Sequence, residues 1–249
     1  MSDKQPDNIT GYNQSLITPA QNREMFNNIS RRYDLLNRIM SAGLDRKWRR
    51  LAVDQLHVVS GGEYIDAGCG TGDLCIEIIG RIQGGQIQVT GIDHSDAMLG
   101  KGMQKIVALA AGNSVTLMRG DAVNLPFKDS TVNGVVSGFV IRNICDRNKA
   151  LVEWHRVIRP GGRCVVLELA VPENPVALLL YKLVTRFLVP AAGALFSKYK
   201  AYVYLIDSIR AFPPPDVFAE MLESAGFRDV RSESLTFGAV RIYSGIKVS

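Results

Sequence analysis

Apolar side chains recur at helical spacing over the first part of the chain, after a polar beginning. Residues 1–20 are mostly polar and predict a flexible tail. From residue 21 to residue 60 the apolar positions fall three or four residues apart, which places them along one face of a helix. Gly43 interrupts this pattern and Ser60-Gly61-Gly62 ends it, as glycines do where helices stop. Three short N-terminal helices are therefore predicted, and the third runs from about residue 45 to residue 59.

The pattern changes after residue 62, where short apolar runs alternate with helical stretches. The runs predict strands at 64–67, 86–92, 115–118, 132–140 and 163–170, with helices at about 73–82, 97–110 and 146–158 between them. Asp146 is expected to cap the helix that it opens. Arg159-Pro160-Gly161-Gly162 is expected to form a turn. Strands that alternate with helices predict a parallel sheet that is doubly wound, with helices on both faces.

A second helical region interrupts this alternation before the chain ends. Residues 174–210 are mostly helical in pattern, another helix follows from 213 to 226, and strands are predicted at 229–235 and 239–248. The predicted fold class is therefore α/β, a doubly wound seven-stranded sheet with N-terminal helices and a helical insertion before the last strands. We expect a single domain over 21–249, divided into N-terminal helices (21–60), a cofactor-binding sheet (63–170), a helical lid or insertion (174–210) and a C-terminal helix with two strands (211–249).

Composition and charge narrow the class of protein. The chain has 249 residues and is 47% hydrophobic, which suffices for one large core and excludes a disordered chain. Its net charge of +5 is concentrated: residues 23–50 carry eight basic and three acidic side chains, and residues 176–206 carry four basic and no acidic ones. The rest of the chain is net acidic. No nucleic-acid partner is expected, because such proteins spread basic charge over a binding face.

Three further features bear on the cell compartment. The four cysteines form no CxxC pair, so neither a metal site nor a disulfide framework is predicted and a reducing cytoplasm fits. The polar N-terminus predicts no signal peptide. Residues 176–196 are apolar over the length of a membrane span but contain Lys182, Arg186 and Pro190. This segment is predicted to be a broken amphipathic helix instead.

A glycine-rich stretch after the first predicted strand is the strongest chemical signal. It reads Asp66-Ala67-Gly68-Cys69-Gly70-Thr71-Gly72-Asp73, and glycines at such a place let the backbone approach a ligand closely. A dinucleotide fingerprint would require glycine at position 73, where an acid would repel a pyrophosphate. A carboxylate suits a ligand with an ammonium group and no phosphate, such as S-adenosyl-L-methionine. Candidate cofactor residues here are Asp66, Gly68, Gly70, Thr71 and Gly72, and a tight turn without a ligand is the structural alternative.

Two later acids repeat this placement after the second and third predicted strands. Asp93 can accept hydrogens from both ribose hydroxyls, with His94 beside it, and Met98 can pack on the adenine face. Asp121, followed by Ala122, can accept a hydrogen from the exocyclic amine of adenine. The alternatives are a capping or solvated acid and a core methionine. Open α/β sheets bind ligands at the carboxyl ends of their strands. The glycine-rich stretch, Asp93 and Asp121 together therefore predict one cofactor site.

At these residues the chain resembles the class I S-adenosyl-L-methionine-dependent methyltransferases, a Rossmann-like fold whose last sheet strand is antiparallel. A more specific resemblance, from about residue 20 to the end, is to the ubiquinone/menaquinone biosynthesis C-methyltransferase family. The motifs that carry it are the stretch 32–44 with Trp48-Arg49-Arg50, then Gly70-Thr71-Gly72-Asp73-Leu74, Leu125-Pro126-Phe127, Arg142-Asn143, Pro160-Gly161-Gly162, and Tyr202-Val203-Tyr204-Leu205. The resemblance implies methylation of a ring carbon in a prenylated quinol, and it adds Ser137 and Gly138 to the cofactor site.

The resemblance also implies roles near the acceptor. A quinol reacts through its anion, and an arginine can lower the pKa of a neighbouring acid by roughly 1–3 units, so Arg142 is the candidate catalytic residue. Asn143 would orient the same oxygen. A salt bridge from Arg142 to an acid such as Asp146 is the alternative. Acceptor-binding candidates are Tyr33, Phe139, Tyr202 and Tyr204, for which a place in the core is the alternative. No histidine is an obvious general base.

Departures from the family pattern leave the acceptor open. Gly138, Val140 and Tyr243 differ from it at places expected to lie near the active site, so another small aromatic or lipid acceptor is the main alternative, and a non-catalytic scaffold that binds S-adenosyl-L-methionine is a further one. A nucleic-acid methyltransferase and a Rossmann oxidoreductase are disfavoured. A prenylated acceptor implies contact with the inner face of a membrane, where Lys182 and Arg186 share a helix face, unless the insertion only covers the site. The oligomeric state, including a homodimer, stays open.

Overall fold

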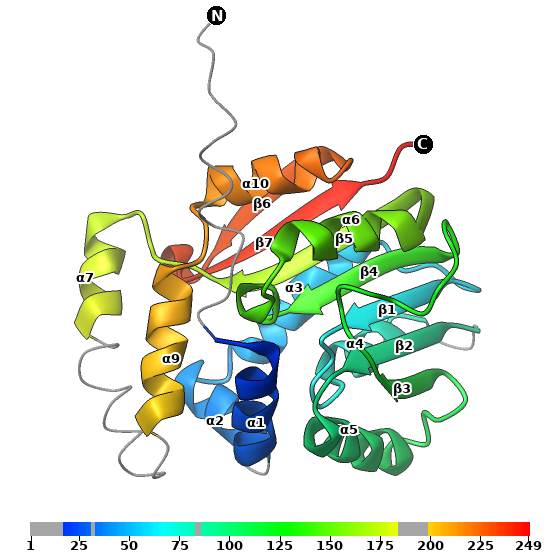
Figure 1. Cartoon of the computed structure of the whole chain (residues 1–249), viewed down its shortest axis with the longest axis horizontal. Coiled ribbons are helices and arrows are strands. Elements are labelled where there is room, and N and C mark those ends of the chain that lie inside the picture. Colours follow the sequence, from blue (N-terminus) through cyan, green and yellow to red (C-terminus); the bar gives the residue numbers. More distant parts are fainter. Residues whose placement is uncertain (1–16, 31–32, 83–85, 184–198) are drawn as a thin grey trace, which may run out of the picture.

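A computed structural model describes residues 17–30, 33–82, 86–183 and 199–249 (Figure 1). The strands are β1 (Glu63–Ala67), β2 (Gln88–Asp93), β3 (Val115–Arg119), β4 (Val132–Gly138), β5 (Ile158–Leu169), β6 (Arg228–Leu235) and β7 (Val240–Ile246). The helices are α1 (Pro19–Ile29), α2 (Tyr33–Met40), α3 (Asp45–Leu56), α4 (Asp73–Ile79), α5 (Asp96–Ala108), α6 (Arg147–Val157), α7 (Pro175–Leu183), α9 (Tyr199–Arg210) and α10 (Pro215–Ser224). Two 3₁₀ turns are η4 (Ile141–Asn143) and η6 (Thr236–Gly238).

The strands form one seven-stranded sheet in the order β3-β2-β1-β4-β5-β7-β6. Neighbouring strands are parallel from β3 through to β5, and β7 is antiparallel to both β5 and β6. The predicted α/β class, strand count and antiparallel last strand are therefore confirmed. β1 lies between β2 and β4, so the chain order reverses direction at β1, and such a reversal opens a crevice at the carboxyl ends of the strands.

Two hydrophobic cores cover the two faces of this sheet. Successive residues of a strand point to opposite faces, and along β5 Cys164 and Val166 join one core while Val165 and Leu167 join the other. One core contains Trp154 of α6 and side chains of α10. The other contains side chains of α3, α4 and α5. Both faces are apolar, which explains why the strands appear in the sequence as continuous hydrophobic runs.

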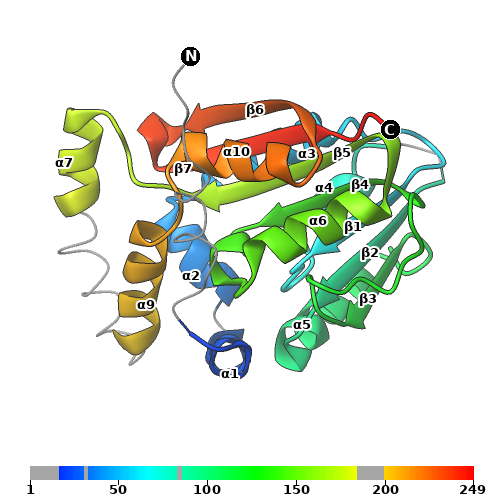
Figure 2. The same ribbon diagram turned by 45° about the horizontal axis from the view of Figure 1, so that its top comes forward.

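The N-terminal helices lie beyond the edge at which the parallel strands end. Figures 1 and 2 show α1, α2 and α9 gathered there, next to the start of α5. Two of the helices that follow strands begin with side-chain caps: Ser95 Oγ accepts from the Met98 N–H at 3.2 Å, and Asp146 Oδ1 accepts from the Lys149 N–H at 2.9 Å. The predicted cap at Asp146 is thus confirmed, and these caps fix the first turns of helices beside the crevice.

The structure differs from the sequence expectations in one element. The predicted turn at residues 159–162 belongs to β5, where the register with β4 shifts between Val132 and Gly134. Gly161 has φ +81° there, and residues 159–162 bulge out of the pairing with β4, which resumes at Arg163. Residues 1–16 of the predicted tail and 184–198 of the predicted insertion, with Arg186 and Pro190, lie outside the described residues. Within the described ranges, no helix has the length and apolar character needed to cross a membrane.

Candidate active site

The glycine loop between β1 and α4 has a backbone that side chains would disturb. Gly68, Gly70 and Gly72 have φ values of +82°, +54° and +78°, in the left-handed region that favours glycine. A Cβ atom on Gly68 would overlap the side chain of Val140, which follows β4. A Cβ atom on Gly70 would meet nothing within 4 Å. The loop is therefore packed tightly on one side and open on the other.

A cavity of about 670 Å³ lies on the open side of this loop. Its volume is in the range of small-molecule sites. Seven of the predicted cofactor residues line it: Gly68, Gly70, Asp93, His94, Met98, Asp121 and Ala122. Six of them follow or end β1, β2 and β3, which the parallel sheet brings to one edge, and Met98 lies in the first turn of α5. Residues of α1 form another part of the wall.

Asp93 holds the glycine loop against β2. Its Oδ2 atom accepts from the Gly70 N–H and its Oδ1 atom from the Ser95 N–H, each at 2.8 Å. Burial raises the pKa of this carboxyl, and these backbone N–H groups act in the opposite direction. Beside it the His94 Nε2 atom is buried and has no hydrogen-bond partner among the described residues. The cavity wall therefore contains a polar atom that a ligand can satisfy.

Five predicted cofactor residues lie behind the cavity wall instead of in it: Asp66, Thr71, Gly72, Ser137 and Gly138. Asp66 is buried under the loop, where the Cys75 thiol donates to its Oδ2 atom at 3.4 Å. The Ser137 hydroxyl donates to the Ala67 carbonyl at 2.7 Å and so ties β4 to β1. Alternation along β1 and β4 turns the side chains of Asp66 and Ser137 toward the faces of the sheet, where they support the loop from beneath. Thr71 and Gly72 belong to the loop itself, and the Thr71 hydroxyl donates to Asp34 Oδ1 at 2.7 Å.

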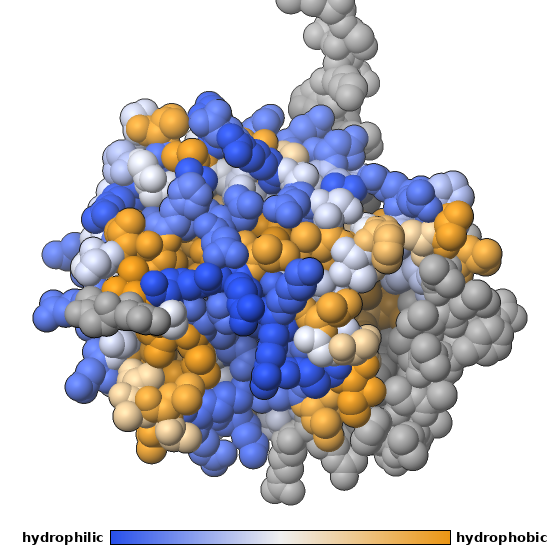
Figure 3. All heavy atoms as spheres, turned by 180° about the vertical axis from the view of Figure 1, so that it is seen from behind, coloured by the Kyte–Doolittle hydropathy of each residue, from blue (hydrophilic) through white to orange (hydrophobic). Residues whose placement is uncertain are grey.

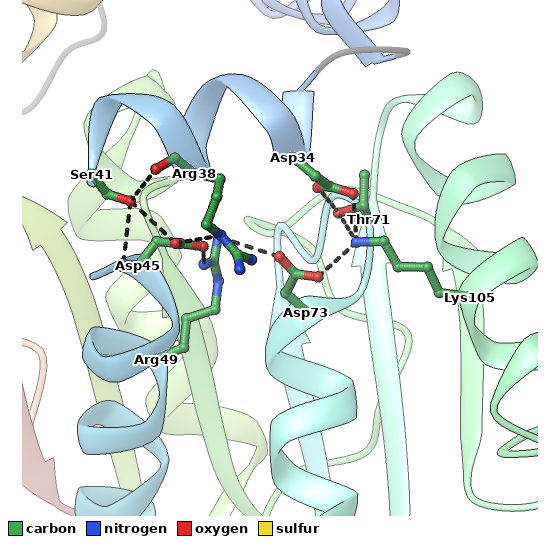
Figure 4. A network of polar contacts seen from close by, with 8 residues as sticks. All are labelled: Asp34, Arg38, Ser41, Asp45, Arg49, Thr71, Asp73 and Lys105. Carbon is green, nitrogen blue, oxygen red and sulfur yellow. Dashed lines mark hydrogen bonds and ion pairs between the residues drawn. The ribbon is translucent and has the colours of Figure 1, made fainter. Parts of the chain in front are cut away.

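An ion-pair network joins the loop to the N-terminal helices (Figure 4). Lys105 Nζ lies 2.6 Å from Asp73 Oδ1 and 2.7 Å from Asp34 Oδ2, and it donates to Thr71 Oγ1 at 2.8 Å. Arg49 lies 3.5 Å from Asp73 and 2.6 Å from Asp45. The carboxylate of Asp73 therefore pairs with the chain's own cations.

A second, smaller cavity of about 160 Å³ adjoins the first. Apolar and aromatic side chains dominate its lining: Met25, Phe26, Ile29, Tyr33, Leu36, Met40, Trp48, Phe139, Leu169, Tyr204 and Leu205, with Asn37, Ser41, Asp45, Arg49 and Arg142. Phe26, Tyr33 and Phe139 line both cavities. Three of the predicted acceptor residues, Tyr33, Phe139 and Tyr204, are thus brought together around this space. The side chain of Tyr202, also on α9, lies outside the described part of the chain.

Arg142 reaches the smaller cavity from the turn η4. Its Nη1 atom donates to Glu168 Oε1 at 2.5 Å and to the Phe139 carbonyl at 2.7 Å. The salt bridge that the sequence proposed to Asp146 is therefore made to Glu168, a fully buried acid of β5. The Nε atom of Arg142 is buried and has no partner among the described residues, so it remains able to donate.

Two polar side chains next to Arg142 complete this region. Asn143 lines the larger cavity, and its Oδ1 atom accepts from the Tyr204 hydroxyl at 2.8 Å. Tyr33 stands between the cavities, and burial raises the pKa of its phenol while a hydrogen bond with Asn37 acts against that rise. At neutral pH Tyr33 is therefore a neutral hydroxyl. Within the described ranges no group of three His, Cys, Asp or Glu side chains is placed to hold a metal ion.

The departures from the family pattern lie in different places. Val140 borders the larger cavity. Tyr243 is buried, with its ring 4.7 Å from that of Phe218, and it lines neither cavity. The expectation that this tyrosine lies near the active site is wrong, because strand alternation in β7 directs it into the core beneath α10. It gives no reason to doubt the acceptor.

Comparison with known proteins identifies the chain. A model of the ubiE/COQ5 methyltransferase family matches residues 16–247. The chain belongs to this family. A ubiquinone/menaquinone biosynthesis C-methyltransferase UbiE of Syntrophotalea carbinolica is 41% identical over 92% of this chain and 95% of its own length. A demethylmenaquinone methyltransferase of Staphylococcus haemolyticus is 38% identical over 90% of this chain and 92% of its own length.

Solved structures agree on the fold of this ubiE/COQ5 family member. A methyltransferase from Thermotoga maritima gives a TM-score of 0.61 at 18% identity, covering 90% of this chain and 99% of that one. A phosphoethanolamine N-methyltransferase of Haemonchus contortus, solved with S-adenosylhomocysteine, gives 0.59 at 16% identity over 80% of this chain and 52% of that one. The predicted Rossmann-like fold and S-adenosyl-L-methionine-dependent methyltransferase class are confirmed.

Replacement of Lys105 by methionine tests the network around the loop. Asp34 would lose its cation and Asp73 one of two, at side chains that are about one quarter to two fifths exposed, so we expect unfolding to become easier by about 1–2 kcal/mol. Urea denaturation measures this change. The matched control is Lys101→Met on the same helix, expected within about 0.5 kcal/mol of the parent. Equal losses for both variants would contradict a special role for Lys105.

The buried acid Asp66 predicts a pH dependence. Burial raises its pKa to about 7, so between pH 4 and pH 7 the folded chain retains a proton that the unfolded chain releases. This group therefore lowers the free energy of unfolding as pH rises through that range. We expect the stability of Asp66→Asn relative to the parent to increase from pH 5 to pH 7 and then level off, by about 1.4 kcal/mol per pKa unit at most. Urea titrations at several pH values measure it, with exposed Asp216→Asn as a control that shows no such trend.

Proposed function

We propose that this chain methylates a ring carbon of a prenylated quinol, converting demethylmenaquinol to menaquinol or performing the equivalent step toward ubiquinone, in the cytoplasm at the inner face of the membrane. The observation that carries this proposal is the pair of cavities with a common aromatic wall at Phe26, Tyr33 and Phe139. An apolar, aromatic-lined cavity suits a quinol ring. The names of the relatives given above support the same acceptor class.

In this proposal the larger cavity holds S-adenosyl-L-methionine, which supplies a methyl group on a positively charged sulfur atom. Ionised carboxylates have about four acceptor sites, so Asp93 can accept from ribose hydroxyls although it already binds two backbone N–H groups. The Asp121 side chain accepts the Val123 N–H through Oδ1, its one hydrogen bond among the described residues, and can accept from an amine as well. Gly70 leaves the space that a side chain would fill. These features fit the ligand, while Asp66, Ser137 and Gly138 lie beneath the loop and Thr71 and Gly72 form its second half.

Arg142 is the proposed catalytic residue on the acceptor side. Its unpartnered Nε–H can donate to a quinol oxygen and favour the anion, which carries negative charge onto the ring carbon. Because Glu168 balances the charge of the guanidinium, the pair is neutral and should lower the quinol pKa by less than an unpaired arginine would. Asn143, held by Tyr204, can orient the same oxygen through its amide.

Transfer of a labelled methyl group tests the function directly. With labelled S-adenosyl-L-methionine and reduced demethylmenaquinone in detergent, we expect label in a product that is one methyl group heavier by mass spectrometry. Calorimetry with S-adenosylhomocysteine runs in parallel. Ligand binding without transfer to any quinol would contradict the proposed acceptor and leave the methyltransferase class standing.

Replacement of Arg142 tests its role in the same assay. Arg142→Lys keeps a cation for Glu168 but moves the donor, and we expect kcat to fall by about 10²–10⁴-fold, the range for loss of acid–base assistance. The dissociation constant of S-adenosylhomocysteine should stay within about twofold, because Arg142 lines only the smaller cavity. A kcat equal to that of the parent, or a parallel loss of cofactor binding, would count against this role.

The outer face of α2 is the proposed contact with the membrane. Leu35 and Ile39, four residues apart, are each 54% exposed, while the inner face of the same helix lines the smaller cavity with Leu36. Arg46 and Lys47 at the start of α3 are exposed and supply charge that suits anionic lipid. Hydrophobic patches on the face shown in Figure 3 are divided by a hydrophilic band. Of the segment that the sequence suggested, residues 176–183 belong to α7, where Val176 and Leu179 are exposed, whereas Arg186 and the side chain of Lys182 lie outside the described residues.

Vesicle binding tests this surface separately from catalysis. We expect Leu35→Asp/Ile39→Asp to weaken binding to phosphatidylglycerol vesicles by about tenfold or more, as the loss of about 1.4 kcal/mol would. Val107, which is 69% exposed on α5 and far from the smaller cavity, supplies the control Val107→Asp. Methyl transfer to a short-tailed quinol in solution should persist in both the double variant and the Val107→Asp control. Unchanged vesicle binding of the double variant would refute the α2 surface.

A further inference from the structure

Helix α1 crosses the larger cavity and is tied down at both ends. Before the helix, the Ile17 carbonyl accepts from the Cys145 thiol at 3.5 Å, beyond the carboxyl end of β4. Near its other end, Asn27 Oδ1 accepts from the Ser95 hydroxyl at 2.6 Å, two residues after Asp93 of β2. The helix therefore spans the crevice between these two strand ends, and its residues form one wall of the cavity.

Asn22 is the polar side chain in that wall whose hydrogen bonding is unfulfilled. It is 2% exposed, and neither its amide nitrogen nor its amide oxygen has a hydrogen-bond partner among the described residues. It lines the larger cavity and not the smaller one. Burial of an amide without partners is costly, so such a group in a cavity wall points to a ligand that supplies them.

The position of Asn22 along α1 indicates which part of the ligand it meets. Phe26, one helical turn later on the same face, lines both cavities and so marks the end at which the methyl group is transferred. Asn22 lies about 6 Å farther from that end, at 1.5 Å per residue, in the direction of Cys145. Cys145 lines the cavity beside the start of α1, and Asp121, which also lines it, is close enough to interact with Cys145 electrostatically, so the base of an adenosyl ligand would lie at this end.

We propose that Asn22 binds the adenine base of the methyl donor. A carboxamide presents a donor and an acceptor side by side, which is complementary to the amine and the adjacent N7 atom of adenine. A purine with a carbonyl in place of the amine presents two acceptors at that edge, and one carboxamide cannot satisfy both. Asn22 would therefore favour adenine over such a purine, while Asp121 can accept the second hydrogen of the same amine. This inference rests on the proposed use of the larger cavity for S-adenosyl-L-methionine.

Two ligands and one substitution test the proposal by calorimetry. The ligands are S-adenosylhomocysteine and its inosine analogue, in which a carbonyl replaces the amine. For Asn22→Leu, which keeps the number and branching of the side-chain heavy atoms, we expect affinity for the adenosyl ligand to fall about tenfold and affinity for the inosyl ligand to change less than about twofold. The preference for adenine should therefore decrease by most of that tenfold factor. The control Asn28→Leu, at an exposed position of α1 that lines neither cavity, should retain it.

Stability supplies an independent measurement. Because Asn22→Leu removes a buried amide without partners, the melting temperature of the ligand-free chain should stay equal or rise, whereas loss of a structural contact would lower it. If the leucine variant lost equal affinity for both ligands, Asn22 would contact a part of the ligand other than the base. If it lost affinity for neither, Asn22 would be a structural residue. Either result overturns the proposal. If the leucine variant fails to fold, Asn22→Ala is compared in the same way. Failure of the parent chain to bind S-adenosylhomocysteine would refute the proposed function itself.

Discussion

The close approach between the glycine loop and the strand end beside it is the constraint on which the rest of the structure depends. At Gly68 there is no room for a Cβ atom against Val140, and the chain must take a left-handed turn at the same residue. Only then does the loop stay close enough for Asp93 to accept the Gly70 N–H. The cavity exists because β1 ends where its neighbours β2 and β4 separate, and the loop turns aside there.

The N-terminal helices convert this open crevice into two connected compartments. α1 closes the larger cavity, while α2 and α3 form much of the smaller one. α1 and α2 are tied to α5 and its cap by polar contacts, from Asp34 to Lys105 and from Asn27 to Ser95, whereas α3 packs apolar side chains into the core. Aromatic side chains occupy the boundary between the compartments. A reaction between two bound molecules requires such a boundary, since proximity and orientation lower the barrier.

Periodicity and local motifs were sufficient to predict the fold and one wall of the site. Parallel strands end at a common edge, so short-range signals at Gly68, Asp93 and Asp121 converge in space without any long-range information. The cap at Asp146 was predictable for the same reason, since a cap involves only neighbouring residues. The register shift within β5 was not, because local turn residues cannot show that strand pairing resumes after them.

The parts of the site that the sequence missed depend on pairing across distance. The sequence gives no spacing signal for the ion pair between Arg142 and Glu168, because 26 residues separate them. It gives none for Lys105 either, because this lysine links side chains from three different elements. Asn22 lies in a polar stretch where an asparagine is ordinary, and only its burial makes it unusual. Tyr243 shows the converse error. Its place in the family pattern suggested a position near the active site, but its side chain lies in the core.

The two tryptophans of the chain occupy very different surroundings. Trp154 is sealed inside the core, where its indole N–H donates to the Ala122 carbonyl at 2.8 Å. Trp48 is in the wall of the smaller cavity, with its ring 6.3 Å from that of Phe139 and its indole N–H bound to Thr236. An aromatic molecule that enters this cavity would come within quenching distance of one indole and leave the other shielded. The native chain thus carries an intrinsic optical signal for acceptor entry, with its own internal reference.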